Sequence, residues 1–156
     1  MSTIIVDTRE QKYGHVEKAF ERAGVKWLRT KLPIGDYARL DNMSVVVDRK
    51  QHLNEVCGNL CQQHERFQRE LLRARDNGIK LIILVESGTV KQLEDVKQWQ
   101  NPRLKVSPYA LSGTGLYRRM ATMQARYGVE WRFCRHQDAG RVICELLGVE
   151  GEWDQT

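Results

Sequence analysis

Hydrophobic positions along the chain alternate between short runs and longer segments with helical spacing. The short runs are rich in β-branched and aromatic residues and predict strands at residues 3–6, 25–31, 36–40, 43–47, 80–85 and 129–134. Apolar residues that recur three or four positions apart predict helices at residues 15–23, 52–76, 90–99, 116–127 and 139–147. Strands that alternate with helices indicate an α/β domain in which helices flank a parallel or mixed sheet.

The chain has the length of one domain and shows no sign of a membrane segment. Its 156 residues contain no repeat, low-complexity tract or linker rich in Pro, Ser or Gly. The longest apolar run, residues 81–85, is far shorter than the about 20 residues that span a bilayer. The N-terminus lacks the basic and apolar stretches of a signal peptide. We therefore expect a cytoplasmic or nucleoid-associated protein, in a bacterial cell or the host of a virus, that is neither secreted nor membrane-bound.

Charge is unevenly distributed along the chain. Apolar residues make up 41% and charged residues 29%, a balance typical of folded domains, and the net charge is +5. Residues 142–156 contain four acidic residues and no Lys or Arg, so they carry −4 and residues 1–141 carry +9. A basic body with an acidic tail favours a polyanionic partner, with nucleic acid as the first candidate. The charge alone fits a merely basic soluble domain equally well.

A cysteine and histidine cluster suggests a zinc site as one alternative. Cys57, Cys61 and His64 follow one another closely, and His136 or Cys134 offers a fourth ligand. Structural zinc sites, however, favour pairs of cysteines in loops with two other residues between them. The three positions instead continue the apolar stripe of the predicted helix 52–76. Buried thiols and a core histidine are therefore the favoured interpretation.

Three charged residues fall at the ends of a predicted hairpin. Asp36 opens its first strand, Asp41 and Asn42 form a favourable turn, and Asp48 and Lys50 close the second strand. A turn there brings position 36 close to position 48, and two carboxylates that meet in this way suit Mg²⁺ or Mn²⁺. Residues 48 and 50 point the same way in a strand. The spacing therefore predicts a divalent metal site, in which the metal lowers the pKa of a bound water and the lysine beside it orients that water and helps to remove its proton.

Five ordered motifs resemble those of the XPF-type nucleases, a family within the PD-(D/E)xK restriction-endonuclease-like superfamily. They are V-D-T-R-E at 6–10, G-D-Y at 35–37, V-V-D-R-K at 46–50, E-R-F at 65–67 and L-I-I-L-V-E at 81–86. The family motifs are V-D-x-R-E, G-D-Y, V-x-E-R-K, G-R-F/L and L-L-I-E, in the same order. The similarity covers residues 3–147 as a nuclease domain and leaves residues 148–156 as a short acidic C-terminal tail. It implies a restriction-endonuclease-like α/β core, a mixed central sheet flanked by helices.

The resemblance implies a role for each matching residue. Asp36 and Asp48 would bind Mg²⁺ or Mn²⁺, and Lys50 would be the catalytic lysine. Six further residues would support the site: Asp7, Arg9 and Glu10 at its rim, Arg49 through its guanidinium, which would also hold the scissile strand, Asn54, and Arg66 on the neighbouring helix. Asp7 and Arg9 also fit an internal ion pair that only braces the fold. Asp48 stands where the family usually has Glu, and Asn54 stands where it has Asp and cannot supply a charge.

Arginines on two predicted helices are candidates for DNA contact. The candidates are Arg66, Arg69, Arg73, Arg118 and Arg119. The first three share one helix face and can follow a phosphate backbone. Acidic residues are interleaved with them, however, so an ordinary solvated face fits nearly as well. The last two lie near a glycine-rich loop and also fit a simply exposed pair.

The function that the resemblance implies is metal-dependent endonucleolytic hydrolysis of DNA that leaves a 5′-phosphate. It also implies a preference for branched DNA, such as flaps, forks or junctions, as in DNA repair or recombination. Relatives carry helix-hairpin-helix modules that grip junctions, and this chain ends soon after the nuclease core, so a homodimer formed through the nuclease domain or a partner protein is expected to supply the grip. Asn54 keeps open an alternative, a non-catalytic DNA-binding or scaffold subunit with a degenerate nuclease fold. The intact Asp36, Asp48 and Lys50 argue against that alternative.

Overall fold

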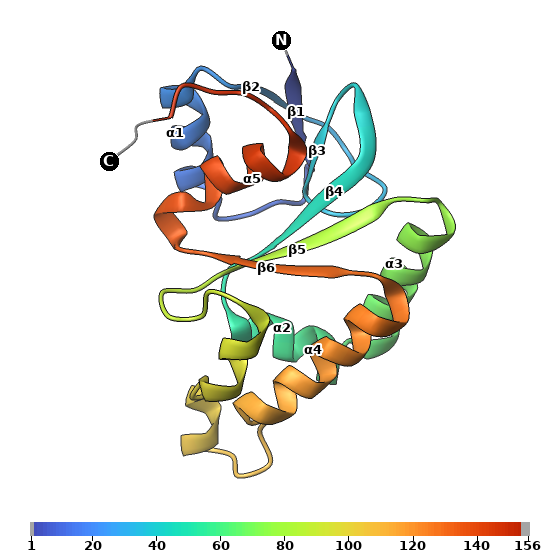
Figure 1. The fold of residues 1–156 in the computed structure, drawn as a ribbon, viewed down its shortest axis with the longest axis vertical. Helices are drawn as coiled ribbons and strands as arrows, with labels where there is room; N and C mark the ends of the chain where they lie inside the picture. The colour runs from blue at the N-terminus through green and yellow to red at the C-terminus, as the bar shows by residue number, and fades with distance from the viewer. Residues whose placement is uncertain (1, 154–156) are drawn as a thin grey trace.

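One mixed sheet of six strands forms the centre of this computed structural model, which describes residues 2–153. The strands are β1 (Thr3–Val6), β2 (Lys26–Arg29), β3 (Tyr37–Arg39), β4 (Asn42–Lys50), β5 (Lys80–Glu86) and β6 (Glu130–Cys134). They lie in the order β2-β1-β3-β4-β5-β6 (Figure 1). Neighbouring strands are parallel except at β3, which is antiparallel to both β1 and β4. The structure thus confirms the predicted α/β class and its mixed sheet.

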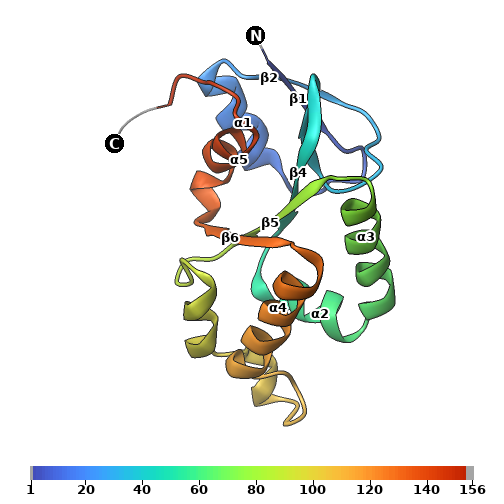
Figure 2. The ribbon, with the colours of Figure 1, turned by 45° about the vertical axis from the view of Figure 1, so that its right-hand side comes forward.

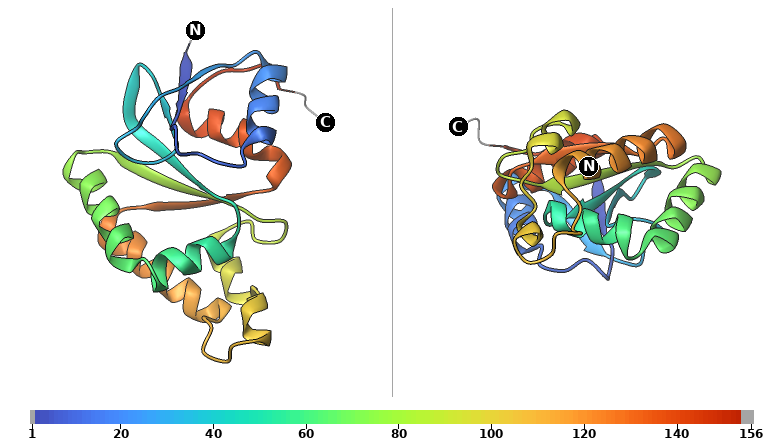
Figure 3. Two further views of the ribbon diagram at one scale, coloured as in Figure 1. Left: turned by 180° about the vertical axis from the view of Figure 1, so that it is seen from behind. Right: turned by 90° about the horizontal axis from the view of Figure 1, so that it is seen from below.

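Helices cover both faces of this sheet. They are α1 (Gly14–Ala23), α2 (Leu53–Cys61), α3 (His64–Asp76), α4 (Gly113–Tyr127) and α5 (Ala139–Leu147), with short 3₁₀ helices η1 (Leu93–Gln98), η2 (Pro102–Lys105) and η3 (His136–Asp138). Helices α1 and α5 pack side by side on one face, and α2, α3 and α4 lie on the other (Figures 2 and 3). Each helical layer therefore encloses its own hydrophobic core against the sheet.

Strand β4 divides its side chains between these two cores. Val46 belongs to the core beneath α2, α3 and α4, whereas Val47 belongs to the core beneath α1 and α5. Because successive side chains of a strand point to opposite faces, Asp48 and Lys50 follow Val46 and Arg49 follows Val47. The D-R-K sequence is thereby split across the sheet, with two residues on one face and one on the other.

The single helix predicted at residues 52–76 is wrong, because the structure forms two helices there. Gln63 has φ −120° and ψ 32°, outside the helical range, and its N–H bonds back to the carbonyl of Gly58. The break lets α3 turn its own apolar residues into the core. Cys61 and His64, on either side of it, are consequently exposed rather than buried as the unbroken stripe predicted.

The remaining differences are local. Residues 90–99 contain the 3₁₀ helix η1 instead of an α-helix, whereas the predicted buried strand at 80–85 is confirmed as β5. The first residues of the predicted acidic tail pack onto α1, since the N–H of Glu152 donates to the carbonyl oxygen of Ala23 at 2.9 Å and Trp153 contacts the core. The last three residues of that tail lie outside the described residues. Among residues 2–153, no helix combines the length and apolar character that crossing a membrane requires.

Candidate functional site

The β3–β4 hairpin brings Asp36 and Asp48 together. Asp36 directly precedes β3, and its N–H donates to the carbonyl oxygen of Val47 at 2.9 Å. Its Oδ2 accepts the N–H of Arg49 at 2.8 Å, which holds the carboxylate against the end of β4. Burial, and after it the charge of Asp48, raises the pKa of Asp36 well above its usual range. The two carboxylates are therefore close enough to repel each other and to share one positive counter-charge.

Lys50 supplies one positive charge to this pair. Its Nζ lies 3.2 Å from Asp48 Oδ2, and the two side chains are 12% and 8% exposed. The ammonium also lies 5.9 Å from the centre of the Phe67 ring. Burial by itself would lower the pKa of Lys50, but the charges of Asp48 and Glu55 outweigh burial and raise it. Lys50 is thus a charged, partly desolvated donor beside the carboxylates.

Glu70, on α3, adds a third carboxylate to this group. The sequence interpretation assigned it to an ordinary solvated helix face. Its Oε1 accepts the N–H of Gly35 at 3.4 Å, which ties α3 to the loop before Asp36. Burial, and after it the charge of Asp48, raises the pKa of Glu70. The ligand oxygens of Asp36, Asp48 and Glu70 do not all approach within 4.8 Å of one another, so Glu70 borders the pair rather than closing onto it.

The helical pattern contained a signal for Glu70. It follows Phe67 by three positions and directly precedes Leu71, and both of these residues are buried. Glu70 therefore borders the buried stripe of α3, where a charged residue needs a partner. That position separates it from Glu65, which is exposed.

A cavity of about 350 Å³ opens onto these carboxylates, and arginines border it. Its lining residues are Asp7, Arg9, Pro33, Gly35, Asp36, Asp48, Arg66, Arg69, Glu70 and Arg73. The four arginine side chains belong to exposed residues. The cavity thus combines an acidic floor with a basic rim, as a site for a phosphate near a cation requires.

Asp7 organises the loop that carries Asp36 to the cavity. Its carboxylate accepts the N–H of Leu32 at 2.7 Å and the Nε–H of Arg9 at 2.8 Å. Its own N–H donates to the carbonyl oxygen of Asp36 at 2.8 Å. Burial alone would raise the pKa of Asp7, but the hydrogen bonds from Arg9 and Leu32 together outweigh burial and lower it. Asp7 and Arg9 therefore lie at the site and also form the internal ion pair that the sequence allowed.

Arg49 lies behind the site, on the α1/α5 face. Its guanidinium donates to Glu10 Oε2 at 2.9 Å, to Glu86 Oε1 at 2.8 Å and to the carbonyl oxygens of Gln11 and Lys12. The side chain is 1% exposed. Arg49 is therefore out of reach of a DNA strand and instead fixes the end of β4. Glu10, predicted at the rim of the site, faces Arg49 and does not line the cavity.

Three other predicted residues lie away from this cavity. Asn54 lines a hollow between α2 and the 101–111 segment, and Arg118 and Arg119 line another beside α4. Glu55, next to Asn54, acts on Lys50 by its charge, after the stronger effect of Asp48.

The zinc alternative finds no support in the geometry. Within residues 2–153, no group of metal-ligand atoms contains Cys57, Cys61 or His64. Cys57 and Cys61 remain together on α2, but the break places His64 on α3. The potential ligands that do converge in the described part of the chain are His15, Glu86 and His136.

Comparisons with known proteins agree with this fold. The family model described as the ERCC4 domain matches residues 6–146. Among solved structures, XPF from Aeropyrum pernix is similar at 24% identity and a TM-score of 0.63, covering 94% of this chain and 60% of that one. XPF from Aeropyrum pernix in complex with DNA is similar at 23% identity and a TM-score of 0.66, covering 95% and 64%. The chain thus spans a little over three fifths of these structures, and no curated protein matches it.

Proposed function

The chain belongs to the ERCC4 domain family, and from this premise we propose that it is a metal-dependent DNA endonuclease. Asp36 and Asp48 would hold the metal, and Lys50 would act beside them on the phosphodiester that is cut. The observation that carries the proposal is the meeting of Asp36 and Asp48 at a cavity rimmed by arginines, with the ammonium of Lys50 3.2 Å from Asp48 Oδ2. A DNA backbone is the polyanion that such a rim suits best.

The residues present fit a hard divalent cation. Asp48 Oδ2 is buried and has no hydrogen-bond partner among residues 2–153, although Lys50 lies 3.2 Å away. Asp36, Asp48 and Glu70 line the cavity and Lys50 lies beside Asp48, so three carboxylates share one nearby ammonium, while the arginines of the rim are exposed. Oxygen ligands of this kind prefer Mg²⁺ or Mn²⁺ over softer metals. Such an ion, when bound, polarises a phosphoryl oxygen and lowers the pKa of water.

The protein's own side chains would position the substrate and hold its phosphates. Lys50 would donate a hydrogen bond to the attacking water or to a phosphate oxygen and so stabilise the charge that develops there. Arg66, Arg69 and Arg73 project from successive turns of α3 along the rim and would pair with neighbouring phosphates. Asp7 would keep the loop before Asp36 in place through Leu32.

We also propose branched DNA, such as flaps, forks or junctions, as the preferred substrate. Arg118 and Arg119, together with Arg126, line a cavity beside α4, apart from the carboxylate cavity. A second basic surface of this kind would accept another arm of a branched molecule. XPF from Aeropyrum pernix has been solved in complex with DNA, which supports a DNA partner. A homodimer or a partner protein would complete the grip on DNA.

The alternative, a non-catalytic scaffold, rests on Asn54. The structure puts Asn54 in a separate hollow, so its missing charge leaves the carboxylates of the cavity complete. Glu55 supplies a negative charge toward Lys50 in its place. These observations favour the endonuclease.

Incubation with labelled flap, fork and duplex DNA in Mg²⁺ or EDTA tests the proposal. We expect cutting in Mg²⁺ only, and a loss of about 10²–10⁴-fold in rate for Asp48→Asn and for Lys50→Ala. DNA binding should persist in both variants, because phosphate contacts from arginines carry most of the affinity. Asp76→Asn neutralises an exposed residue of α3 and is the matched control. This variant should cut DNA at the wild-type rate. Tight binding by the wild-type chain without cutting in Mg²⁺ or Mn²⁺ would establish the scaffold instead.

A further inference from the structure

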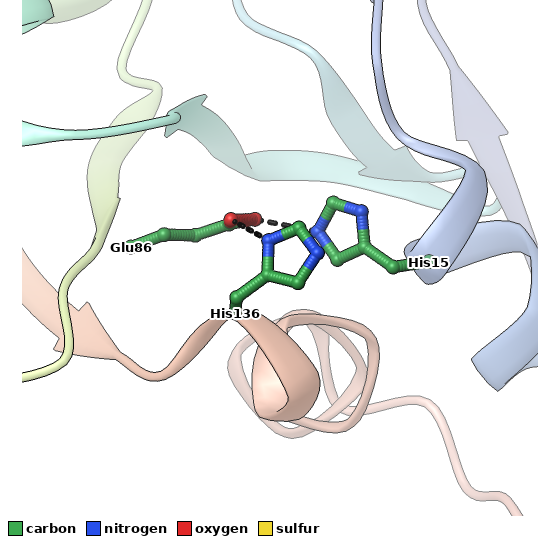
Figure 4. A group of neighbouring side chains, drawn as sticks. All are labelled: His15, Glu86 and His136. Carbon is green, nitrogen blue, oxygen red and sulfur yellow. Dashed lines mark hydrogen bonds and ion pairs between the residues drawn. The ribbon is translucent and has the colours of Figure 1, made fainter.

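Two histidines and a glutamate converge on the face of the sheet opposite the carboxylate cavity. His15 lies in the first turn of α1, Glu86 ends β5, and His136 begins η3 (Figure 4). They come from three elements that are far apart in the sequence. The proposed nuclease uses none of these side chains.

The ligand atoms of the three residues are close together. His15 Nε2 lies 2.6 Å from Glu86 Oε1, and His136 Nδ1 lies 2.8 Å from Glu86 Oε2. The two imidazole rings stack with their centres 3.6 Å apart and their planes 19° apart. Glu86 is 4% exposed and His15 is 18% exposed, whereas His136 is 66% exposed and opens the cluster to solvent.

The charges around Glu86 leave room for one more cation. Arg49 donates to Glu86 Oε1 and also to Glu10, so its single positive charge is shared between two carboxylates. Glu10, Glu86 and Arg49 together therefore carry a net charge of −1. The ion would replace the histidine contacts to Glu86, and Arg49 would keep its hydrogen bond to Oε1, as a metal-binding carboxylate commonly has such a second hydrogen bond.

We propose that His15, Glu86 and His136 form a binding site for Zn²⁺ or a similar transition-metal ion. Imidazole nitrogens with one carboxylate suit zinc, which takes such three-residue sets with an open fourth position, and they do not suit Mg²⁺. Ligands at about 2.0–2.1 Å in a tetrahedron lie about 3.3 Å apart, so His15 Nε2 and the carboxylate need to separate by about 0.7 Å. His15 would have to move away from Glu86, and the exposed His136 ring would have to turn out of the stack so that both imidazole lone pairs point at the ion, while solvent can occupy the fourth position.

Bound zinc would link α1, β5 and η3 in this protein. His15 and His136 anchor the helical elements, and Glu86 anchors the sheet. The same ion would hold Glu86 in place and, through it, the guanidinium of Arg49 behind β4. The site would thus tie these three elements together, and it is separate from the metal proposed for DNA cleavage.

Equilibrium dialysis against Zn²⁺ in a large excess of Mg²⁺ tests the site, because Mg²⁺ occupies the oxygen ligands of the other face. We expect one zinc per chain for the wild type. His136→Ala and His15→Ala should each bind zinc at least about 100-fold more weakly, since even residues outside the ligand set commonly contribute 10–100-fold. His64→Ala, an exposed histidine outside the cluster, and the Cys57→Ser/Cys61→Ser double variant should retain the zinc. Zinc that is retained by both cluster variants, or lost with the cysteines, would overturn the proposal.

Nitrogen-15 NMR of the imidazoles provides a readout that does not depend on folding stability or on DNA cleavage. The geometry requires zinc on Nε2 of His15 and on Nδ1 of His136. Addition of Zn²⁺ should therefore shift these two nitrogens selectively and raise the melting temperature of the wild type but not of His136→Ala. Unchanged nitrogen shifts at saturating Zn²⁺ would show that the three residues form a hydrogen-bonded cluster only. Either result stands independently of nuclease activity.

Discussion

Asp36→Asn should stabilise the metal-free protein while abolishing its response to Mg²⁺. Asp36, Asp48 and Glu70 border one cavity floor and have Lys50 as their shared ammonium. Two like charges about 4 Å apart repel by about 4 kcal/mol at an effective dielectric constant of about 20. Lys50 offsets part of this repulsion. Asparagine has the shape of aspartate, and its amide oxygen can still accept the N–H of Arg49, so the fold loses no hydrogen bond.

We expect a net gain of about 1–2 kcal/mol in the free energy of unfolding for Asp36→Asn in EDTA near neutral pH, after the offset by Lys50. For a chain of this size that gain raises the melting temperature by about 2–8 °C. Mg²⁺ should stabilise the wild type by mass action and should leave the variant nearly unchanged. Thermal unfolding followed by circular dichroism, with and without Mg²⁺, measures both effects.

Asp76→Asn is the control for this experiment, because Asp76 is exposed at the end of α3 and faces none of these carboxylates. Its stability should change little in either condition. An Asp36→Asn variant that is less stable than the wild type in EDTA would refute the reasoning. So would a variant that Mg²⁺ stabilises as strongly as the wild type, since the carboxylates would then not share one cation.

Three other changes test how the site is built. Gly35→Ala should lower the free energy of unfolding by about 2–4 kcal/mol in urea denaturation, because Gly35 has φ +74° and an added Cβ would meet a side-chain atom at 2.3 Å. Gly58→Ala, where an added Cβ meets nothing within 4 Å, should be neutral or slightly stabilising. Equal effects of the two substitutions would contradict a steric conflict at Gly35. Asp7→Asn should lower stability near neutral pH by about 1–3 kcal/mol. Because the folded-state pKa of Asp7 is lowered, its contribution to stability is present above the unfolded pKa and is lost as the pH falls through the folded pKa. The urea midpoint between about pH 5 and pH 2 should therefore fall less steeply for the variant than for the wild type. Glu70→Gln should raise the Mg²⁺ concentration for half-maximal cleavage about tenfold, while Glu65→Gln should not; identical Mg²⁺ titrations would place Glu70 outside the site.

Local patterns predicted the parts of the fold that depend on neighbouring residues. The β-branched run at residues 80–85 is the buried strand β5, and the glycine after residue 147 ends α5 in a left-handed conformation. The single helix predicted at residues 52–76 is wrong, because the local pattern does not reveal where the chain breaks. Apolar spacing continues in phase from Leu60 to Phe67, but Gln63 leaves the helical range, so the chain forms two helices there.

The sequence by itself determined that Asp36, Asp48 and Lys50 meet, because a hairpin has a short turn and a side-chain period of two, and both are local properties. Tertiary structure alone decided what surrounds them. Glu70 reaches the carboxylates because α3 packs across the end of the hairpin, and no local pattern states which helix face meets which strand. The cluster of His15, Glu86 and His136 likewise exists because the start of α1, the end of β5 and the start of η3 lie at the same place on one face of the sheet. Contacts between distant elements depend on how the helices pack on the two faces of the sheet. That packing is fixed only when both hydrophobic cores have formed.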